Sequence, residues 1–322
     1  MRFSHFAAMA LITTLHLIIP LVLIVWTLAR TYPSAIAVII QILVLVFYAA
    51  FIFLMGSWVF ASFYLRYVVL GLSIAVALWS LLRIKGLPLF VSPPVPGWIG
   101  YGAGVVILCM LVYLLVGAVR SHSYDESPVN LAFPFKNGVY AVFEGGNGRV
   151  SSLMNYHYGA SMHKGARTNL SMRYAVDITK LTRWGNDAAG FLPLQNEKYA
   201  VFNQVLYSPC DGKVSFVEDK WSNEKPWSGN PPYNVGNHIL ITSADCGVLM
   251  GHIQKGSIIV KVGDVVKKGQ PIAQVGNSGW TSQPHLHIQA MRIAAGPFWS
   301  WEGVPIFFDG TNPVKNTLFF EK

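Results

Sequence analysis

Two histidines separated by one residue stand in the C-terminal part of the chain, in the stretch SQPHLHIQA at residues 282–290. In an extended strand successive side chains point to opposite faces, so His285 and His287 would share one face and the apolar residues of the stretch the other. The apolar face can pack in a core. Two imidazoles on one face are a known way to offer nitrogen ligands to a metal ion, so the pair indicates a metal site.

The segments around this pair make a metal site more specific. The glycine-rich stretch GNSGWTSQ comes directly before it, and a short GHI segment about thirty residues upstream supplies His252. Residues 260–275, VKVGDVVKKGQPIAQV, resemble a half-motif of biotinyl and lipoyl carrier domains. Lys267 and Lys268 lie where a turn needs solvated residues, so we interpret this stretch as a structural hairpin.

The elements that must position these residues belong to a chain of two unlike parts. Residues 1–120 contain no Asp or Glu and only six of the 24 Lys and Arg residues. The remaining residues hold the other 18 basic and all 15 acidic residues, which is ordinary globular composition. The basic excess of that second part is only three and contains no run of Lys and Arg, which argues against nucleic-acid binding.

The first part contains four long apolar runs, at residues 6–29, 35–55, 67–82 and 98–119. About 20 apolar residues are needed to cross a bilayer as a helix, so we expect four transmembrane helices. His16 lies inside the first run, where we expect a neutral imidazole packed between helices. The basic residues are shared equally between the two sides of such a bundle and do not decide its orientation.

The second part is made of short β-rich runs separated by Gly, Asn and Asp, with no long helical period. The sequence therefore predicts an all-α transmembrane bundle of four helices at residues 1–120, a polar linker at 121–138, and an all-β domain, an antiparallel sheet or sandwich, at 139–322.

From about Asn155 to Ile288 the second part resembles the lysostaphin/LytM-type zinc endopeptidases, which cut peptide bonds in bacterial peptidoglycan. The matching segments, in order, are NYHYG, RYAVDI, SPCDGKV, GNHILI, GHIQKGSIIVKVGDVVKKGQPIAQVGNSG and PHLHI. The resemblance implies that Asp177 and His287 are zinc ligands. It also implies that His252 and His285 flank the reacting water and the scissile carbonyl as catalytic residues.

One position departs from the family pattern. The usual first motif is His-x-Gly-x-Asp, but here the residue four before Asp177 is Arg173, and arginine cannot ligate zinc. A subgroup of the family has an Asn-x-His segment ahead of Arg-Tyr-Ala-x-Asp, which makes His157 the expected third ligand. His163, or a site without metal, are the alternatives.

The expected chemistry is that of an open zinc site. Two neutral imidazoles and one carboxylate leave a fourth position for water, whose pKa zinc lowers to roughly 7. No His-Glu-x-x-His helix supplies a glutamate base, so His252 and His285 would manage the protons and the oxyanion. In the family the segments of Cys210 and Cys246 lie close together, so a disulfide in an oxidising compartment and two inert thiols are both open.

The resemblance implies a membrane-anchored zinc metalloendopeptidase that hydrolyses peptide bonds in peptidoglycan. Its partners would be a peptidoglycan peptide and the lipid bilayer, with the peptidase domain on the extracytoplasmic side of a bacterial inner membrane. The alternatives are a degenerate relative that binds a cell-wall hydrolase or a division protein, and a signalling protein whose bundle senses a ligand. Nothing in the sequence identifies the bond that is cut or a protein partner.

Overall fold

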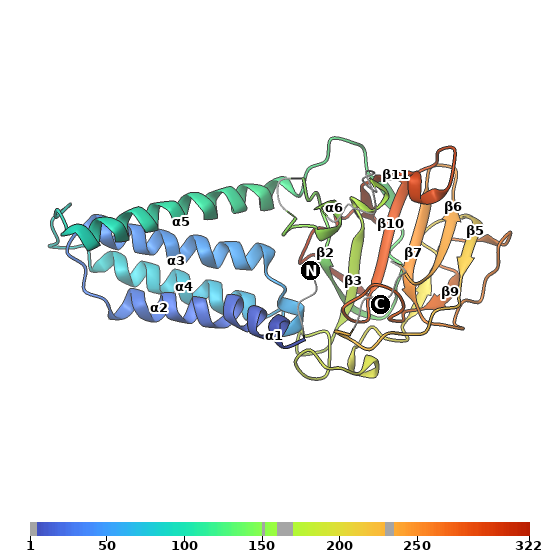
Figure 1. Ribbon diagram of the computed structural model, residues 1–322, viewed down its shortest axis with the longest axis horizontal. Coiled ribbons are helices and arrows are strands. Elements are labelled where there is room, and N and C mark those ends of the chain that lie inside the picture. Colours follow the sequence, from blue (N-terminus) through green and yellow to red (C-terminus); the bar gives the residue numbers. More distant parts are fainter. Residues whose placement is uncertain (1–4, 150–151, 160–169, 229–234) are drawn as a thin grey trace.

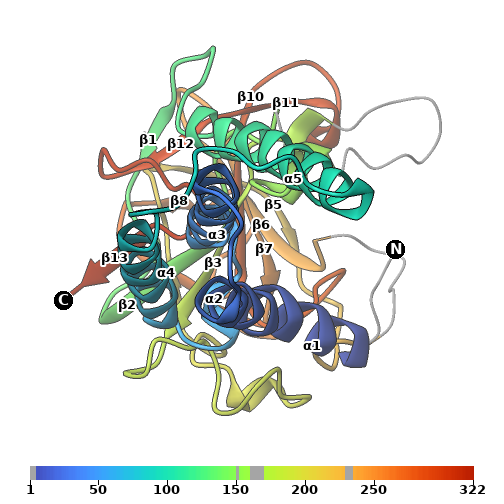
Figure 2. The same ribbon diagram turned by 90° about the vertical axis from the view of Figure 1, so that its left-hand side faces the viewer.

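The computed structural model describes residues 5–149, 152–159, 170–228 and 235–322 of the chain. Four long apolar helices form an elongated bundle, and a mostly antiparallel β domain sits on one end of it (Figure 1). Seen along the bundle, the helices lie in front of the β domain (Figure 2).

The four predicted apolar helices are present, each long enough to cross a membrane: His5–Ala29, Ala35–Met55, Leu65–Leu82 and Val95–Arg120, of 25, 21, 18 and 26 residues. The helical segments of the bundle are α1 (His5–Thr13), the π-helical turn η1 (Thr14–Ile18), α2 (Ile19–Ala29), α3 (Ala35–Met55), the 3₁₀ turn η2 (Trp58–Phe60), α4 (Leu65–Leu82) and α5 (Val95–Arg120). Ser34 caps α3, its side chain accepting from the amide of Ala37.

The π-helical turn in the first helix has a local cause. Pro20 has no N–H to donate to the carbonyl of His16, so the regular ladder is interrupted there. The His16 ring is buried, with Nδ1 2.9 Å from the carbonyl of Ile12, while Nε2 accepts from the amide of Ser57 at 2.9 Å. The ring therefore carries its proton on Nδ1 and is neutral, packed between helices as expected.

The β domain is built on a nine-stranded antiparallel sheet. Its order is β13-β2-β3-β10-β7-β6-β5-β8, with β11 also pairing β10. These strands are β2 (Gly138–Glu144), β3 (Val176–Leu181), β5 (Gly212–Glu218), β6 (Asn237–Thr242), β7 (Gly247–Ile253), β8 (Val265–Val266), β10 (Leu286–Arg292), β11 (Glu302–Val304) and β13 (Leu318–Glu321).

Short elements complete the domain. They are β1 (Val129–Leu131), which pairs in parallel with β12 (Ile306–Phe308), the antiparallel pair β4 (Val205–Tyr207) and β9 (Pro271–Gln274), the one-turn helix α6 (Tyr156–Gly159), and the 3₁₀ turns η3 (Leu170–Met172), η4 (Asn196–Lys198) and η5 (Phe298–Ser300).

The alternation expected in residues 282–290 is present in β10. Leu286, Ile288 and Ala290 are fully buried in the main apolar core of the domain. His287 lies on the other face and pairs across the sheet with Asp177 of β3. The strand thus anchors its imidazole face through the burial of its apolar face.

The segment expected to be a linker contributes to the β domain. It contains β1, and Phe133 and Phe135, which follow β1, belong to the main apolar core. The ring of Phe133 stacks on that of Phe319 with centroids 4.3 Å apart. The division at residues 1–120, 121–138 and 139–322 stays a prediction.

The bundle and the β domain share an apolar core. Val59, Phe60 and Phe63 of the α3–α4 connection pack with Phe143, Leu181 and Leu192 of the β domain in one buried cluster. Both ends of the bundle sequence meet the β domain: His5 Nε2 lies 2.7 Å from the carbonyl of Leu192, and the amide of Asn147 donates to the carbonyl of Ser121.

Candidate functional site

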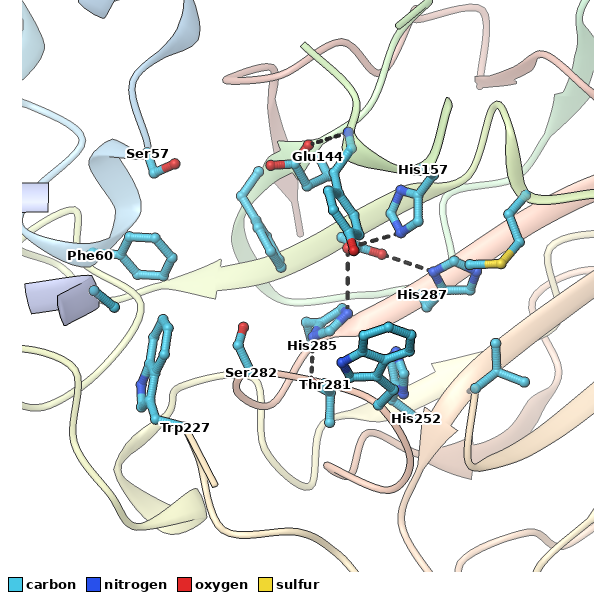
Figure 3. A pocket seen from close by; sticks show the side chains of 17 residues that line it. Ser57, Phe60, Glu144, His157, Trp227, His252, Thr281, Ser282, His285 and His287 are labelled. Atoms are coloured by element: carbon cyan, nitrogen blue, oxygen red, sulfur yellow. Dashed lines mark hydrogen bonds and ion pairs between the residues drawn. The ribbon is translucent and has the colours of Figure 1, made fainter. Parts of the chain in front are cut away.

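Three neighbouring elements bring the predicted metal ligands together. His287 comes from β10, Asp177 from the adjacent strand β3, and His157 from the one-turn helix α6. One donor atom from each of the three lies within 4.8 Å of the other two, and all three residues are buried (Figure 3). His163 lies outside the described residues.

The carboxylate of Asp177 is the centre of this group. One oxygen, Oδ1, lies 3.0 Å from His287 Nδ1, and the other, Oδ2, lies 3.4 Å from His157 Nε2 and 3.5 Å from His285 Nε2 (Figure 3). Burial alone would raise the pKa of Asp177. Its electrostatic interactions with His157 and His285, together with its side-chain contacts to His285 and His287, outweigh burial and hold the pKa of Asp177 well below its usual value.

Asn155 orients His157. The Asn155 amide nitrogen donates to the carbonyls of Gly146 and Ala175, so its oxygen faces the His157 ring. That oxygen lies 3.1 Å from His157 Nδ1, which therefore carries the proton and leaves a lone pair on Nε2 facing Asp177. Burial lowers the pKa of His157 to about 4 despite the neighbouring carboxylate, so the ring is neutral at pH 7.

Gln289 plays the corresponding part for His287. The Gln289 oxygen lies 3.0 Å from His287 Nε2, and its amide nitrogen contacts the sulfur of Met291. A proton on Nε2 leaves the lone pair of Nδ1 facing Asp177 at 3.0 Å. Lone pairs of two imidazoles thus point toward a carboxylate. The ring nitrogens and the carboxylate oxygens repel one another unless a cation lies among the three donors.

The two predicted catalytic histidines lie beside this group, and backbone carbonyls fix their rings. His252 Nδ1 is 2.7 Å from the carbonyl of Ser278, and His285 Nδ1 is 2.8 Å from that of Gln283. The ring centroids of His252 and His285 are 4.6 Å apart. With each Nδ1 held by a carbonyl, Nε2 is the atom that can serve a reacting group, and that of His285 lies 3.5 Å from Asp177 Oδ2.

Their surroundings separate the two rings electrostatically. Burial, reinforced by His285 and His287, holds the pKa of His252 well below its ordinary value. Burial also acts on His285, but the charge and hydrogen bond of Asp177 outweigh it and raise its pKa. His252 suits a proton acceptor, and His285 suits a proton donor.

The backbone of His252 is strained. Its φ angle is +59°, a left-handed conformation that costs a non-glycine residue about 1–2 kcal/mol. Two backbone hydrogen bonds, from its amide to Val235 and from the amide of Gly276 to its carbonyl, hold it there. Such strain is typical of residues placed by the fold for chemistry.

Arg173 does not reach this group. Its guanidinium pairs with Glu126 at 3.0 Å and with Glu302, and it lies over the ring of Tyr174. In the structure His157, not Arg173, completes the set of three donors.

A cleft of about 370 Å³ opens over these residues. Phe143, Tyr156, Trp227 and Trp280 line it from the β domain, and Phe143 meets His285 edge-to-face with centroids 5.2 Å apart. The sequence did not indicate Glu144, which also lines the cleft and pairs with Lys315 at 2.9 Å. Its only sequence signal is a charge at the end of a β-rich run.

The cleft is also lined by residues of the apolar bundle, which no sequence pattern places there. Ala8 of α1 and Ser57 and Phe60 of the α3–α4 connection contribute to it. In Figure 3 the labelled side chains of Ser57 and Phe60 lie across the cleft from the histidines.

The cysteines of the β domain are thiols in the structure. Cys246 is buried and Cys210 is half-buried against the main core. Burial, with Cys246 nearby, raises the pKa of Cys210 to about 12. The disulfide stays a prediction.

Comparison with known proteins gives consistent matches to one peptidase family. The model of Peptidase family M23 matches residues 199–298, which include His252, His285 and His287 but neither His157 nor Asp177. The glycyl-glycine endopeptidase ALE-1 of Staphylococcus capitis is 37% identical over 81 residues, 25% of this chain and 19% of that protein. The peptidoglycan DD-endopeptidase ShyB of Vibrio cholerae is 34% identical over 86 residues, 27% of this chain and 17% of that protein.

Among solved structures, the catalytic domain of lysostaphin from Staphylococcus simulans is 25% identical. The match covers 41% of this chain and 75% of that domain, with a TM-score of 0.27. The chain spans less than a fifth of the length of the curated relatives it matches. Following its four apolar helices, this chain contains an M23 peptidase domain homologous to those of lysostaphin, ALE-1 and ShyB.

Proposed function

We propose that the chain is a membrane-anchored zinc metalloendopeptidase that hydrolyses peptide bonds in peptidoglycan. The observation that carries the proposal is the convergence of unprotonated donors. His157 Nε2 and His287 Nδ1 both turn lone pairs toward the Asp177 carboxylate, while Asn155 and Gln289 hold the opposite ring nitrogens. Two neutral imidazoles and one carboxylate suit zinc in a catalytic site, where three protein ligands leave a position open.

In this proposal His157, Asp177 and His287 hold the ion. Zinc supplies Lewis acidity, which polarises a carbonyl and makes a water more acidic. His252, whose ring is neutral and whose Nδ1 is fixed by Ser278, accepts a proton from the attacking water at Nε2. His285 donates a hydrogen bond to the oxyanion that develops and a proton to the leaving amine.

The rest of the site excludes water and orients the peptide. The rings of Phe143, Trp227 and Trp280 give the cleft an apolar wall, so charged groups that develop there are poorly solvated and respond strongly to the histidines. Lys315 pairs with Glu144, so Asp177 is the one carboxylate among the described residues lining the cleft that has histidines and no Lys or Arg as partners.

We further propose that the four helices anchor the protein in a bacterial inner membrane, with the peptidase domain on the extracytoplasmic side. Peptidoglycan lies on that side. The first and last helices both meet the β domain at the same end of the bundle, which fits four crossings. An exported reporter fused after residue 121 should be active, and activity of a reporter that works only in the cytoplasm would refute this orientation.

Zinc analysis of the full-length protein, followed by digestion of isolated peptidoglycan, tests the enzymatic function. Wild-type protein should bind one zinc per chain and release new amino groups, detected by mass spectrometry of the fragments. His252→Ala and His285→Ala should keep the zinc and lose at least about 10²-fold in turnover. A folded wild type that takes up no zinc from an excess would instead support the regulator that binds a cell-wall hydrolase.

A further inference from the structure

The cleft lies between the peptidase domain and the helical bundle. The histidines and Asp177 line it from the β domain, whereas Ala8, Ser57 and Phe60 line it from the bundle. The ring of Phe60 meets that of Trp227 at 6.0 Å between centroids, which joins the two sides at one end. A peptide that fills the cleft therefore contacts the bundle as well.

Hydrogen bonds fix the bundle side of this cleft to the β domain. The amide of Asp187 donates to the carbonyl of Val59 at 2.8 Å, and the amide of Phe63 donates to the carbonyl of Gly185 at 2.7 Å. From the C-terminal end of the chain, the Asn316 amide donates to the carbonyls of Leu54 and Gly56. These hydrogen bonds are made by residues before and after Ser57 and Phe60 in the chain. The bundle side of the cleft, formed by Ala8, Ser57 and Phe60 and here called the wall, therefore has a defined position.

Contacts within the bundle also hold this wall in place. The amide of Ser57 donates to His16 Nε2 at 2.9 Å, and the indole of Trp58 donates to the carbonyl of Ile52 at 2.6 Å. Gly56 has no room for a side chain: a Cβ there would lie 2.4 Å from the oxygen of Ile52 and 2.8 Å from His16 Nε2. The wall is thus part of the packed end of the helices.

This position fixes the distance between the site and the bilayer. Ser57 and Phe60 come two and five residues after Met55, the last residue of the second apolar helix. Five residues span at most about 18 Å, and the headgroup layer of a bilayer is itself about 5–8 Å thick. Ala8 lies within the first apolar helix. The cleft therefore opens at the membrane surface, if the helices cross the membrane as proposed.

We infer that the substrate is a peptidoglycan peptide on a strand whose own lipid anchor still holds it in the same bilayer. This inference rests on the proposed function and names its substrate class. A strand far from the membrane would have to reach a cleft walled by the ends of the helices. A lipid-anchored strand is held at that height, and its effective concentration there is high. The reaction is hydrolysis: the peptide C–N bond breaks, hydroxyl goes to the carbonyl carbon, and a proton goes to the amine.

The apolar character of the wall agrees with this class. Phe60, Phe143 and Trp227 face a cleft whose described lining includes no Lys or Arg, and its two carboxylates pair with Lys315 and with the histidines. Trp227 is of a residue type that proteins enrich at the membrane–water interface, because its ring joins an apolar body to a polar N–H.

A series of lipid-anchored peptides with spacers of increasing length tests the inference. Full-length protein in phosphatidylethanolamine–phosphatidylglycerol vesicles is given one cross-linked peptidoglycan peptide, joined to a dialkyl lipid in the same vesicles by spacers of about 10, 30 and 100 Å. The same peptide without lipid, and isolated cross-linked peptidoglycan, serve as unanchored substrates. We expect the peptide on the two shorter spacers to be cut at least 10-fold faster than on the longest spacer, at equal surface density.

A bulky side chain in the wall gives an independent test. Ser57→Tyr adds a ring on the bundle side, away from every zinc donor, and should slow cleavage of all probes at least 10-fold with unchanged zinc content and melting temperature. Ser92→Tyr is the matched control, because Ser92 is exposed in the connection at the far end of the bundle. Wild-type turnover by Ser57→Tyr would show that substrate does not pass this wall, and would overturn the inference.

A wrong function and a wrong substrate class give different results in this assay. If zinc-loaded wild type cuts none of the probes, including the unanchored ones, the proposed function is wrong. If the unanchored peptide and isolated peptidoglycan are cut as fast as the peptide on the shortest spacer, the function stands and the membrane-held substrate is wrong.

Discussion

The set of zinc ligands can be tested most sharply at His157, because the family pattern places its first ligand at the position of Arg173. We expect His157→Ala to lose zinc about as severely as Asp177→Ala or His287→Ala. All three donors belong to one group within 4.8 Å, and removing any of them leaves two protein ligands.

The size of the effect follows from the number of ligands. Apparent binding energies of zinc in four-ligand structural sites are about 10–16 kcal/mol, or about 2.5–4 kcal/mol per protein ligand. Losing one ligand should therefore weaken binding roughly 10²–10³-fold. Asn155→Ala removes only the group that orients His157, and a change of that kind typically costs about 10–100-fold.

Zinc content is measured after dialysis against a series of competing chelator concentrations, with the melting temperature of each variant as the control for folding. His252→Ala and His285→Ala should bind zinc like the wild type, because their ring nitrogens serve the reacting groups. His157→Ala with wild-type affinity would refute the ligand assignment. If His163→Ala were then the variant that lost zinc, the alternative ligand would be established.

Three further predictions concern charge and titration. Arg173→Ala should keep wild-type zinc affinity in the chelator assay, and breaking its partly exposed ion pairs should lower the unfolding free energy by only about 1 kcal/mol. The free energy of unfolding of the metal-free protein should fall as the pH drops from 6.5 toward 4, because His157 binds a proton in the unfolded chain but not in the folded one. The difference between the pKa values of 6.5 and about 4 sets an upper limit of about 3 kcal/mol on this loss. Thermal melts of His157→Gln should show a weaker pH dependence. In reduced, folded protein, Cys210 and Cys246 should react with iodoacetamide at pH 8 at least 10²-fold more slowly than after denaturation, because burial raises both pKa values, that of Cys210 to about 12; rapid labelling of the folded protein would contradict this packing.

Properties that local sequence determines were predictable. Four apolar runs without acidic residues predict four helices, because hydrocarbon tolerates few charges and requires a self-satisfied backbone. The alternation in residues 282–290 predicts the two faces of β10, because side chains in a strand point alternately to opposite sides. The residues of the candidate site followed from motif order in the resemblance, since no local pattern links His157 to Asp177, twenty positions later.

Features that depend on distant contacts were not predictable. The polar, proline-marked stretch 121–138 resembles a linker, yet Val129 pairs with Ile306, far along the chain. A three-residue strand has too few residues to show a period, so its pairing is invisible until its partner is known. The bundle side of the cleft is similar: Ser57 stands among apolar residues, and only the packing of the whole chain brings it opposite the histidines.

The contact between bundle and β domain continues into the site itself. The carbonyl of Val59 accepts from the amide of Asp187, and the carboxylate of Asp187 accepts from the side chain of Gln283 at 2.5 Å. The carbonyl of Gln283 in turn fixes Nδ1 of His285. Burial raises the pKa of Asp187 to about 7, because the packing around this carboxyl disfavours its charged form. A fragment that begins at residue 121 would lack Val59, which accepts from the amide of Asp187, and Phe60 and Phe63, which pack with the β domain. The ring of His285 would then rest on a loop without its support, and for that reason the catalytic tests belong on the full chain.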